Sequence, residues 1–274
     1  MPRFPMVLLS GQHADMNHNP SRTRRAAGAA SVLLALLLGG CAGTNGDPPV
    51  SLDKSAVSHV AGAAEASGEY AAAAGIYAKY AESHPNDPGM QASFGNAALA
   101  AGEVDKAESA FRKALALDPR RAEAHMGLGR VYLARKEPQK ALGEFRAVLA
   151  ANPKDTRALN GSGIALDLLG HGREAQQAYR SALAVKPDDR AAQNNLGLSL
   201  ALSGQYDRAV TELSPLALEP GATPRMRHNL ALALGLKGDM AGAAKIEKKD
   251  LNQAAIADNQ RFYEAVRRAM TATQ

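Results

Sequence analysis

The sequence predicts an all-α protein in which helical hairpins stack side by side. Its composition favours helix over sheet, because alanine and leucine dominate and tryptophan is missing from the chain. The second observation is an internal period of about 34 residues, which is typical of arrays whose hairpins bury apolar surface against their neighbours. The residues that follow this period are Gly95, Gly129, Gly163 and Gly197; Ala73, Ala107, Ala141, Ala175, Ala209 and Ala243; Pro85, Pro119, Pro153 and Pro187; Tyr77, Phe111, Phe145 and Tyr179; and Gly68, Gly102, Gly170, Gly204 and Gly238.

Residues 1–40 have the pattern of a signal peptide that precedes the folded part. Residues 22–25 read Arg-Thr-Arg-Arg and supply a positive segment, and the apolar run Ala26–Leu38 follows it. This run is shorter than the roughly 20 apolar residues that a transmembrane helix needs. Met16 is the candidate translation start, because residues 1–15 do not resemble the beginning of a signal peptide.

The residues that end this segment, Leu38-Gly39-Gly40-Cys41, resemble the lipobox of bacterial lipoproteins. The resemblance implies cleavage before Cys41 and a covalent lipid on its thiol, which would anchor the chain to a membrane. Cys41 is the only cysteine, so an internal disulfide is excluded. Ala42 follows it, and in this family that residue implies transfer to the outer membrane, facing the periplasm. Residues 41–53 contain glycine and proline without apolar periodicity and predict a flexible tether.

The repeat itself resembles the tetratricopeptide repeat, which implies a right-handed α-solenoid of helix-turn-helix units. Six units cover residues 54–257, beginning near residues 54, 88, 122, 156, 190 and 224. Within a unit, glycine at position 8 and alanine at position 20 let the two helices cross closely, and the aromatic residue at position 24 fills space between successive units. Glycine at position 15 ends the first helix, and proline at position 32 stops the second.

The outer units depart from this signature. In the fifth, Leu213 replaces the aromatic residue and Pro215 falls inside the second helix, which we therefore expect to be shortened or kinked. In the sixth, Glu247 stands at the aromatic position. Residues 258–274 complete the chain, and apolar residues at helical spacing from Asn259 to Met270 predict a C-terminal capping helix.

In this repeat family the first helices line a concave face that binds protein partners. The polar or adaptable residues that the resemblance places on that face are Asn96, Met126, Arg130, Arg157, Asn160, Asp167, Asn194 and His228. Asparagine amides both donate and accept hydrogen bonds, so they can hold the backbone of a bound peptide. The lysines of the carboxylate-clamp relatives are missing, so an acidic C-terminal tail is not the ligand expected in this groove.

Charge and motifs argue against nucleic-acid binding and catalysis. The formal charge is +5, but without residues 1–40 the chain has 28 basic and 26 acidic residues, or +2. No phosphate-binding loop occurs, and Gly161-Ser162-Gly163 lacks the other residues of a nucleophile elbow. Neither cysteine nor histidine shows the spacing of metal ligands. We therefore expect no enzyme activity, no metal and no cofactor, apart from the covalent lipid at Cys41.

The C-terminal third carries a narrower resemblance. Asn194-Asn195-Leu196-Gly197, Arg227-His228-Asn229, Lys249-Asp250-Leu251, Asn259 and Phe262-Tyr263 together resemble the TadD family of lipoproteins, which serve tight-adherence (Flp/Tad) pilus assembly. The resemblance implies that the chain assists pilus components, including the secretin, from the outer membrane. Two alternatives stay open: a scaffold for another envelope machine, such as outer-membrane protein insertion or peptidoglycan synthesis, and an envelope enzyme.

Overall fold

A computed structural model describes residues 53–271, and this range contains thirteen α-helices and no strand. The all-α fold class expected from the composition is therefore confirmed. The described residues form two compact units, 53–136 and 137–271, called here the N-terminal and C-terminal units. Within these residues, no helix has the length and hydrophobicity that crossing a bilayer requires. The predicted signal peptide, Met16 and Cys41 lie outside the described range.

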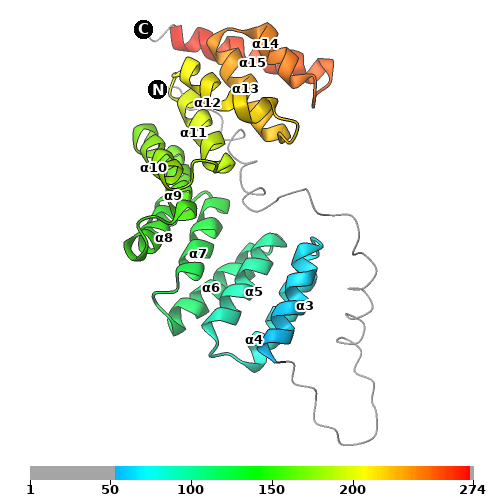
Figure 1. The fold of residues 1–274 in the computed structure, drawn as a ribbon, viewed down its shortest axis with the longest axis vertical. Coiled ribbons are helices and arrows are strands. Elements are labelled where there is room, and N and C mark those ends of the chain that lie inside the picture. Colours follow the sequence, from blue (N-terminus) through cyan, green and yellow to red (C-terminus); the bar gives the residue numbers. More distant parts are fainter. Residues whose placement is uncertain (1–52, 272–274) are drawn as a thin grey trace, which may run out of the picture. The chain divides into compact units, whose positions relative to one another are not determined.

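The N-terminal unit consists of two complete helical hairpins and one further helix (Figure 1). Its helices are α3 (Lys54–Ala66), α4 (Tyr70–Ser83), α5 (Pro88–Ala100), α6 (Val104–Leu117) and α7 (Ala122–Ala134). Each helix packs on the next one along the chain, and α5 also contacts α7. First helices of consecutive repeats therefore lie side by side, as they do in a stacked array.

The C-terminal unit contains the other eight helices of the described chain. They are α8 (Pro138–Ala151), α9 (Thr156–Leu168), α10 (Gly172–Val185), α11 (Arg190–Leu202), α12 (Tyr206–Leu218), α13 (Pro224–Lys237), α14 (Met240–Glu247) and α15 (Gln253–Thr271). The first helices α9, α11 and α13 contact one another in sequence, and α15 packs on α13 and α14 (Figure 1).

The start of each first helix follows from local capping chemistry. First helices begin at residues 54, 88, 122, 156, 190 and 224, and this even spacing reproduces the period of the sequence. An acidic residue precedes most of them and accepts hydrogen bonds from the first-turn amides, as Asp189 does from Ala191 and Ala192. Thr223 does the same for α13, whereas Arg121 before α7 makes no side-chain cap.

Small residues and bulky rings interlock between the helices. The ring of Phe111 lies so close to Gly95 of its own repeat and Gly127 of the next that a Cβ atom at either would be within 2.7 and 2.2 Å of it. The large residue at position 24 packs in the same way in later repeats, Tyr179 on Gly163 and Leu213 on Gly197. A methyl group at these glycines would force side chains or backbone to move.

The turn inside each hairpin requires a left-handed residue. Glycine supplies it in five hairpins, for example at Gly102 with φ of 82° and Gly170 with φ of 80°. Lys136 occupies the same place after α7 with φ of 59°. Among the described residues that are not glycine, Lys136 is the one with a positive φ. A side chain at this φ crowds the backbone, so Lys136 carries a conformational strain that the glycines avoid.

The last repeats differ from the earlier ones. Helix α12 continues through Pro215 and ends at Leu218, so it has 13 residues where α10 has 14. Helix α14 has only 8 residues. The final helix begins at Gln253 rather than near Asn259, because the Asn252 side chain caps its first turn by accepting a hydrogen bond from the Ala255 amide. The expected boundary after residue 257 therefore falls inside α15.

Candidate protein-binding surface

The predicted groove residues of the N-terminal unit lie on α5 and α7. Asn96 and Arg130 occupy the same repeat position on these two contacting helices, and both side chains are partly exposed. Met126 is 9% exposed and contributes mainly to the core. The first helices of this unit therefore offer an amide and a guanidinium, with a thioether largely covered beneath the surface.

In the C-terminal unit the predicted asparagines are linked to the next repeat. Asn195 Nδ2 donates to Asn160 Oδ1 at 2.9 Å, and Asn229 Nδ2 donates to Asn194 Oδ1 at 3.0 Å. Asn160, Asn194 and Asn195 are all buried. Their amides therefore connect α9 to α11 and α11 to α13, so these asparagines stabilise the array. That Asn160 and Asn194 also contact a partner stays a prediction.

Sequence reasoning missed the donors of this network. Asn195 and Asn229 directly follow a position 5 residue, and Arg225 Nη2 donates to Asn195 Oδ1 at 3.0 Å. The signal in the sequence was the pair Asn194-Asn195, because adjacent residues on a first helix point toward different neighbours. Asn195 bonds Asn160 of the repeat before it and Arg225 of the repeat after it, and Asn194 bonds Asn229 of the repeat after it.

Asp167 is held at the junction of three helices. Its carboxylate accepts hydrogen bonds from Ser199 Oγ of α11 at 2.7 Å and from the Tyr179 hydroxyl of α10 at 3.0 Å. Burial raises the pKa of Asp167 to about 7, although both hydrogen bonds favour the ionised form. Burial and the adjacent Asp167 charge also raise the pKa of Tyr179. Asp167 is therefore a proton-binding group near neutral pH.

The sequence carries a signal for this pairing. Position 12 is acidic in the two repeats that have tyrosine at position 24, as Asp167 with Tyr179 and Glu65 with Tyr77. It is leucine in the two repeats that have phenylalanine there, as Leu99 with Phe111. The tyrosine hydroxyl needs an acceptor when its ring is buried, which explains why the two positions change together.

Arg157 and His228 are the more exposed of the predicted residues in the C-terminal unit. The side chain of Arg157 is 72% exposed, and its guanidinium lies 3.8 Å from Asp155. The His228 side chain is 42% exposed, and its Nε2 lies 3.9 Å from Asp250 Oδ2. Together with Asn96 and Arg130, they give the first helices groups that can bond peptide carbonyls and carboxylates.

Several residues that carry the pilus-protein resemblance have structural partners. Arg227 donates to both carboxylate oxygens of Asp250, at 2.6 and 2.5 Å, and this bond holds the pKa of Asp250 below its usual value. Asn259 and Tyr263 both donate to Glu247 Oε1, at 2.8 and 2.7 Å. These contacts attach the C-terminal helices to α13 and α14, so the fold itself accounts for these residues.

Residues 53–271 contain no group of three or more histidine, cysteine, aspartate or glutamate side chains that could hold a metal ion. The hydrogen bonds above join side chains of neighbouring helices to one another.

The stacked hairpins, in which glycines and large rings interlock, give the described residues an all-helical repeat fold. Residues 93–156 and 160–214 match the family model of the tetratricopeptide repeat. No curated protein sequence matches the chain.

Solved structures show the same fold at low sequence identity. A tetratricopeptide repeat protein from Parabacteroides merdae superposes with a TM-score of 0.64 at 18% identity, covering 80% of this chain and 87% of the other. A thermophilic repeat protein from Thermus thermophilus, TTC0263, gives 0.58 at 21% identity, covering 66% and 99%. YrrB, described as having an unusual peptide-binding site, gives 0.53 at 20% identity, covering 68% and 97%.

Proposed function

We propose that the chain is a noncatalytic scaffold of the bacterial envelope, and that its first helices bind an extended segment of a partner protein. The observation that carries this proposal is the side-by-side packing of first helices within each unit, α5 on α7 and α9 on α11 on α13. Such packing creates a continuous surface that no single repeat has. The peptide-binding site in the description of YrrB supports this use of the fold.

The chemistry of the surface suits a peptide backbone. Asn96 supplies an amide that both donates and accepts, while Arg130 and Arg157 supply donors to carbonyl or carboxylate oxygens. Within the N-terminal unit, Asn96 and Arg130 stand at the same repeat position on the contacting helices α5 and α7. An extended segment can therefore bond these two repeats in succession.

Site-specific photo-crosslinking tests this surface directly. A benzoylphenylalanine would be introduced at Asn96 and, separately, at Arg157, in full-length protein expressed in its own cells. Matched controls at Lys113 of α6 and Arg173 of α10 place the same probe on second-helix positions. We expect one partner band from the first-helix positions and none from the controls. Equal crosslinking from both helix sets would contradict the proposal.

A finer proposal concerns the anchor. We infer that Cys41 carries a lipid that holds the scaffold at the outer membrane on its periplasmic side, and the motif Leu38-Gly39-Gly40-Cys41 supports this inference. Metabolic labelling with a palmitate analogue should mark the wild-type protein and not Cys41→Ser. Membrane fractionation then assigns the label to the inner or the outer membrane. If the wild-type protein is not labelled, the proposed lipid on Cys41 is wrong.

The particular machine that we propose is the Flp/Tad pilus, with the secretin or another assembly component as the partner. The support is the resemblance of residues from Asn194 to Tyr263 to lipoproteins of that system. Deleting the gene should reduce secretin multimers and surface pili, and the wild-type gene should restore both. If crosslinking recovers proteins of outer-membrane insertion or peptidoglycan synthesis instead, the scaffold serves that machine.

A further inference from the structure

The side chain of Asp167 lies on the face of α9 that the repeat pattern assigns to the groove. Asn160, Ile164 and Asp167 follow one another at i, i+4 and i+7, so they share one face of the helix. Asn160 and Ile164 are 8% and 4% exposed, whereas Asp167 is partly exposed. An incoming segment can therefore reach the carboxylate of Asp167 more easily than the two side chains before it.

This carboxylate has acceptor capacity that the fold leaves unused. Its Oδ1 accepts from Ser199 Oγ at 2.7 Å and its Oδ2 from the Tyr179 hydroxyl at 3.0 Å, and both donors are neutral. An ionised carboxylate offers about four acceptor sites, so only part of its capacity is taken. Burial raises the pKa of Asp167 to about 7, and no cation of residues 53–271 pairs with it to offset the cost of its charge. Asp167 also lies in the last turn of α9, where the helix dipole favours a positive group.

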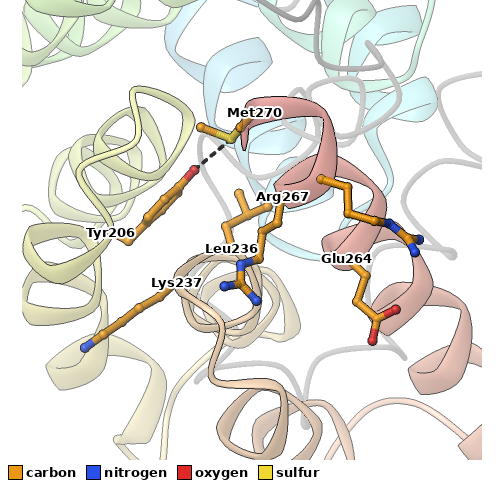
Figure 2. A pocket seen from close by; sticks show the side chains of 7 residues that line it. Tyr206, Leu236, Lys237, Glu264, Arg267 and Met270 are labelled. Atoms are coloured by element: carbon orange, nitrogen blue, oxygen red, sulfur yellow. Dashed lines mark hydrogen bonds between the residues drawn. The ribbon is translucent and has the colours of Figure 1, made fainter. Parts of the chain in front are cut away.

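The cations of the last hairpins pair with groups other than this carboxylate. Lys237, Arg267 and Arg268 line the cavity between α12, α13 and α15 (Figure 2). The Lys237 ammonium pairs with Asp207 at 2.7 Å. None of these three side chains forms an ion pair with Asp167. The positive charge at the end of the array therefore does not neutralise the groove carboxylate.

Two arginines of the first helices do not neutralise it either. Arg225 of α13 lowers the pKa of the Tyr179 hydroxyl, but its Nη2 donates to Asn195 Oδ1 at 3.0 Å and it forms no ion pair with Asp167. Arg157 lies ten residues before Asp167 on the same helix, about 15 Å away along its axis. Salt largely screens charges at that separation, because the Debye length is about 8 Å at physiological ionic strength. The C-terminal unit thus leaves one groove carboxylate without a countercharge.

We propose that Asp167 binds the ammonium group of a lysine in the partner polypeptide that occupies the groove, an inference that rests on the function proposed above. An ammonium is a compact charge that can donate to either oxygen. The planar fork of arginine instead needs both oxygens open side by side, and here each already accepts one hydrogen bond. The methylene stem of the lysine can lie along Ile164, which stands one helical turn before Asp167. Asp167 is then a specificity residue that selects a segment with a lysine at one position.

Fluorescence anisotropy with blocked heptapeptides tests this selection on the full-length protein in an uncharged detergent. The host peptide is Ser-Leu-Ala-Xaa-Ala-Leu-Ser with a neutral fluorophore and a C-terminal amide, and Xaa is lysine, norleucine, arginine or glutamate. We expect the lysine peptide to bind about ten-fold more tightly than the norleucine peptide, and the glutamate peptide to bind most weakly. Equal affinities, no binding of any peptide, or an arginine peptide that binds as tightly as the lysine peptide would overturn the proposal.

Asp167→Asn removes the charge while it keeps the size of the side chain and an oxygen that can accept a hydrogen bond. Lysine and norleucine peptides should bind this variant equally, and a preference for lysine that survives would refute the assignment. The matched control is Asp188→Asn, which removes an exposed carboxylate between α10 and α11. This control should keep the preference, and its loss there would reduce the effect to net charge. The peptide series on the wild type needs no variant, so the test holds even if Asp167→Asn unfolds.

Failure of this site can be told apart from failure of the groove. Photo-crosslinking from Asn96 and Arg157 reports on the groove and does not depend on Asp167. A crosslinked partner together with equal affinities of the four peptides would refute the lysine site and leave the groove in place. If neither crosslinking nor peptide binding is seen, the groove itself is wrong, and the lysine site is wrong with it.

Discussion

The Tyr263 hydroxyl of α15 donates a 2.7 Å hydrogen bond to Glu247, a carboxylate that is 1% exposed at the end of α14. Glu247 stands where earlier repeats have a large ring, and the Tyr263 ring lies instead on Gly235 of α13. Burial and the adjacent carboxylate raise the pKa of Tyr263, so the phenol stays protonated and keeps donating. The ring that packs the last hairpin thus comes from the capping helix.

The fit of Tyr263 on Gly235 predicts that Gly235→Ala detaches α15. A Cβ atom at residue 235 would lie 2.2 Å from the Tyr263 ring, so overpacking should cost about 1–3 kcal/mol. Limited proteolysis should then remove the C-terminal helix faster than it does in the wild type. The control is Gly143→Ala in α8, where the added methyl has nothing within 4 Å and should stabilise the helix. Similar proteolysis of both variants would contradict this account.

The asparagine network predicts that Asn195→Ala destabilises the C-terminal unit. The substitution leaves Asn160 Oδ1 and the Arg225 guanidinium without this partner, at a cost of about 1–3 kcal/mol. Urea unfolding followed by circular dichroism measures the loss. Asn160→Ala and the double variant complete a mutant cycle, in which the two single effects should not add. Strict additivity would mean that the bond contributes nothing.

The raised pKa of Asp167 predicts a pH-dependent stability. Because the folded-state pKa is about 7 and the unfolded value is about 3.9, the folded protein binds the extra proton between these values. This carboxyl therefore makes stability fall as pH rises from about 4 to 7, by at most about 1.4 kcal/mol per pH unit, and contributes no slope above that. Asp167→Asn should flatten the profile of stability against pH, whereas Asp188→Asn, at an exposed position, should leave that profile unchanged. Parallel profiles of wild type and Asp167→Asn would refute the assignment.

The strained turn predicts that Lys136→Gly stabilises the protein. Removing the side chain at φ of 59° relieves about 1 kcal/mol of crowding, less the extra entropy of glycine in the unfolded chain. The thermal midpoint should rise by roughly 2 °C. Lys113→Gly in α6 removes a lysine from a helix interior and should lower stability by about 1 kcal/mol. A fall in midpoint for both variants would show that residue 136 is not strained.

The fold class could be predicted because its causes are local and repeated. The glycine at position 8 has one steric role, so Gly95 and Gly163 could be assigned to helix crossings without knowledge of the rest of the chain. Capping is equally local, and Asp189 marks the start of α11 in the sequence itself. The apolar spacing around Phe262 does not mark the start of α15, because that start is set by the Asn252 cap.

The candidate site is harder to predict from the sequence, because a polar side chain of one repeat can form a hydrogen bond with the next repeat instead of with a partner protein. The repeat pattern predicts Asn160 and Asn194 as peptide-binding amides, but in the structure an amide of the next first helix donates to each of their side-chain oxygens. The choice between a partner and a neighbour depends on distances that a repeat consensus does not contain. The Arg157 guanidinium lies near Asp155, the N-cap residue of its own helix, and its exposure follows from its place near the start of α9.

The packing of the Tyr263 ring of α15 on Gly235 of α13 limits where in-frame duplication can lengthen the repeat array. The second to fourth repeats each keep glycine at position 8 and a ring at position 24, so duplicating one of them in frame inserts a hairpin with the same packing residues. A hairpin inserted between α14 and α15 would meet Glu247 where it needs a ring and would displace Tyr263 from its glycine partner at residue 235. A duplicated hairpin can therefore pack within the interior of the array but not at its C-terminal end.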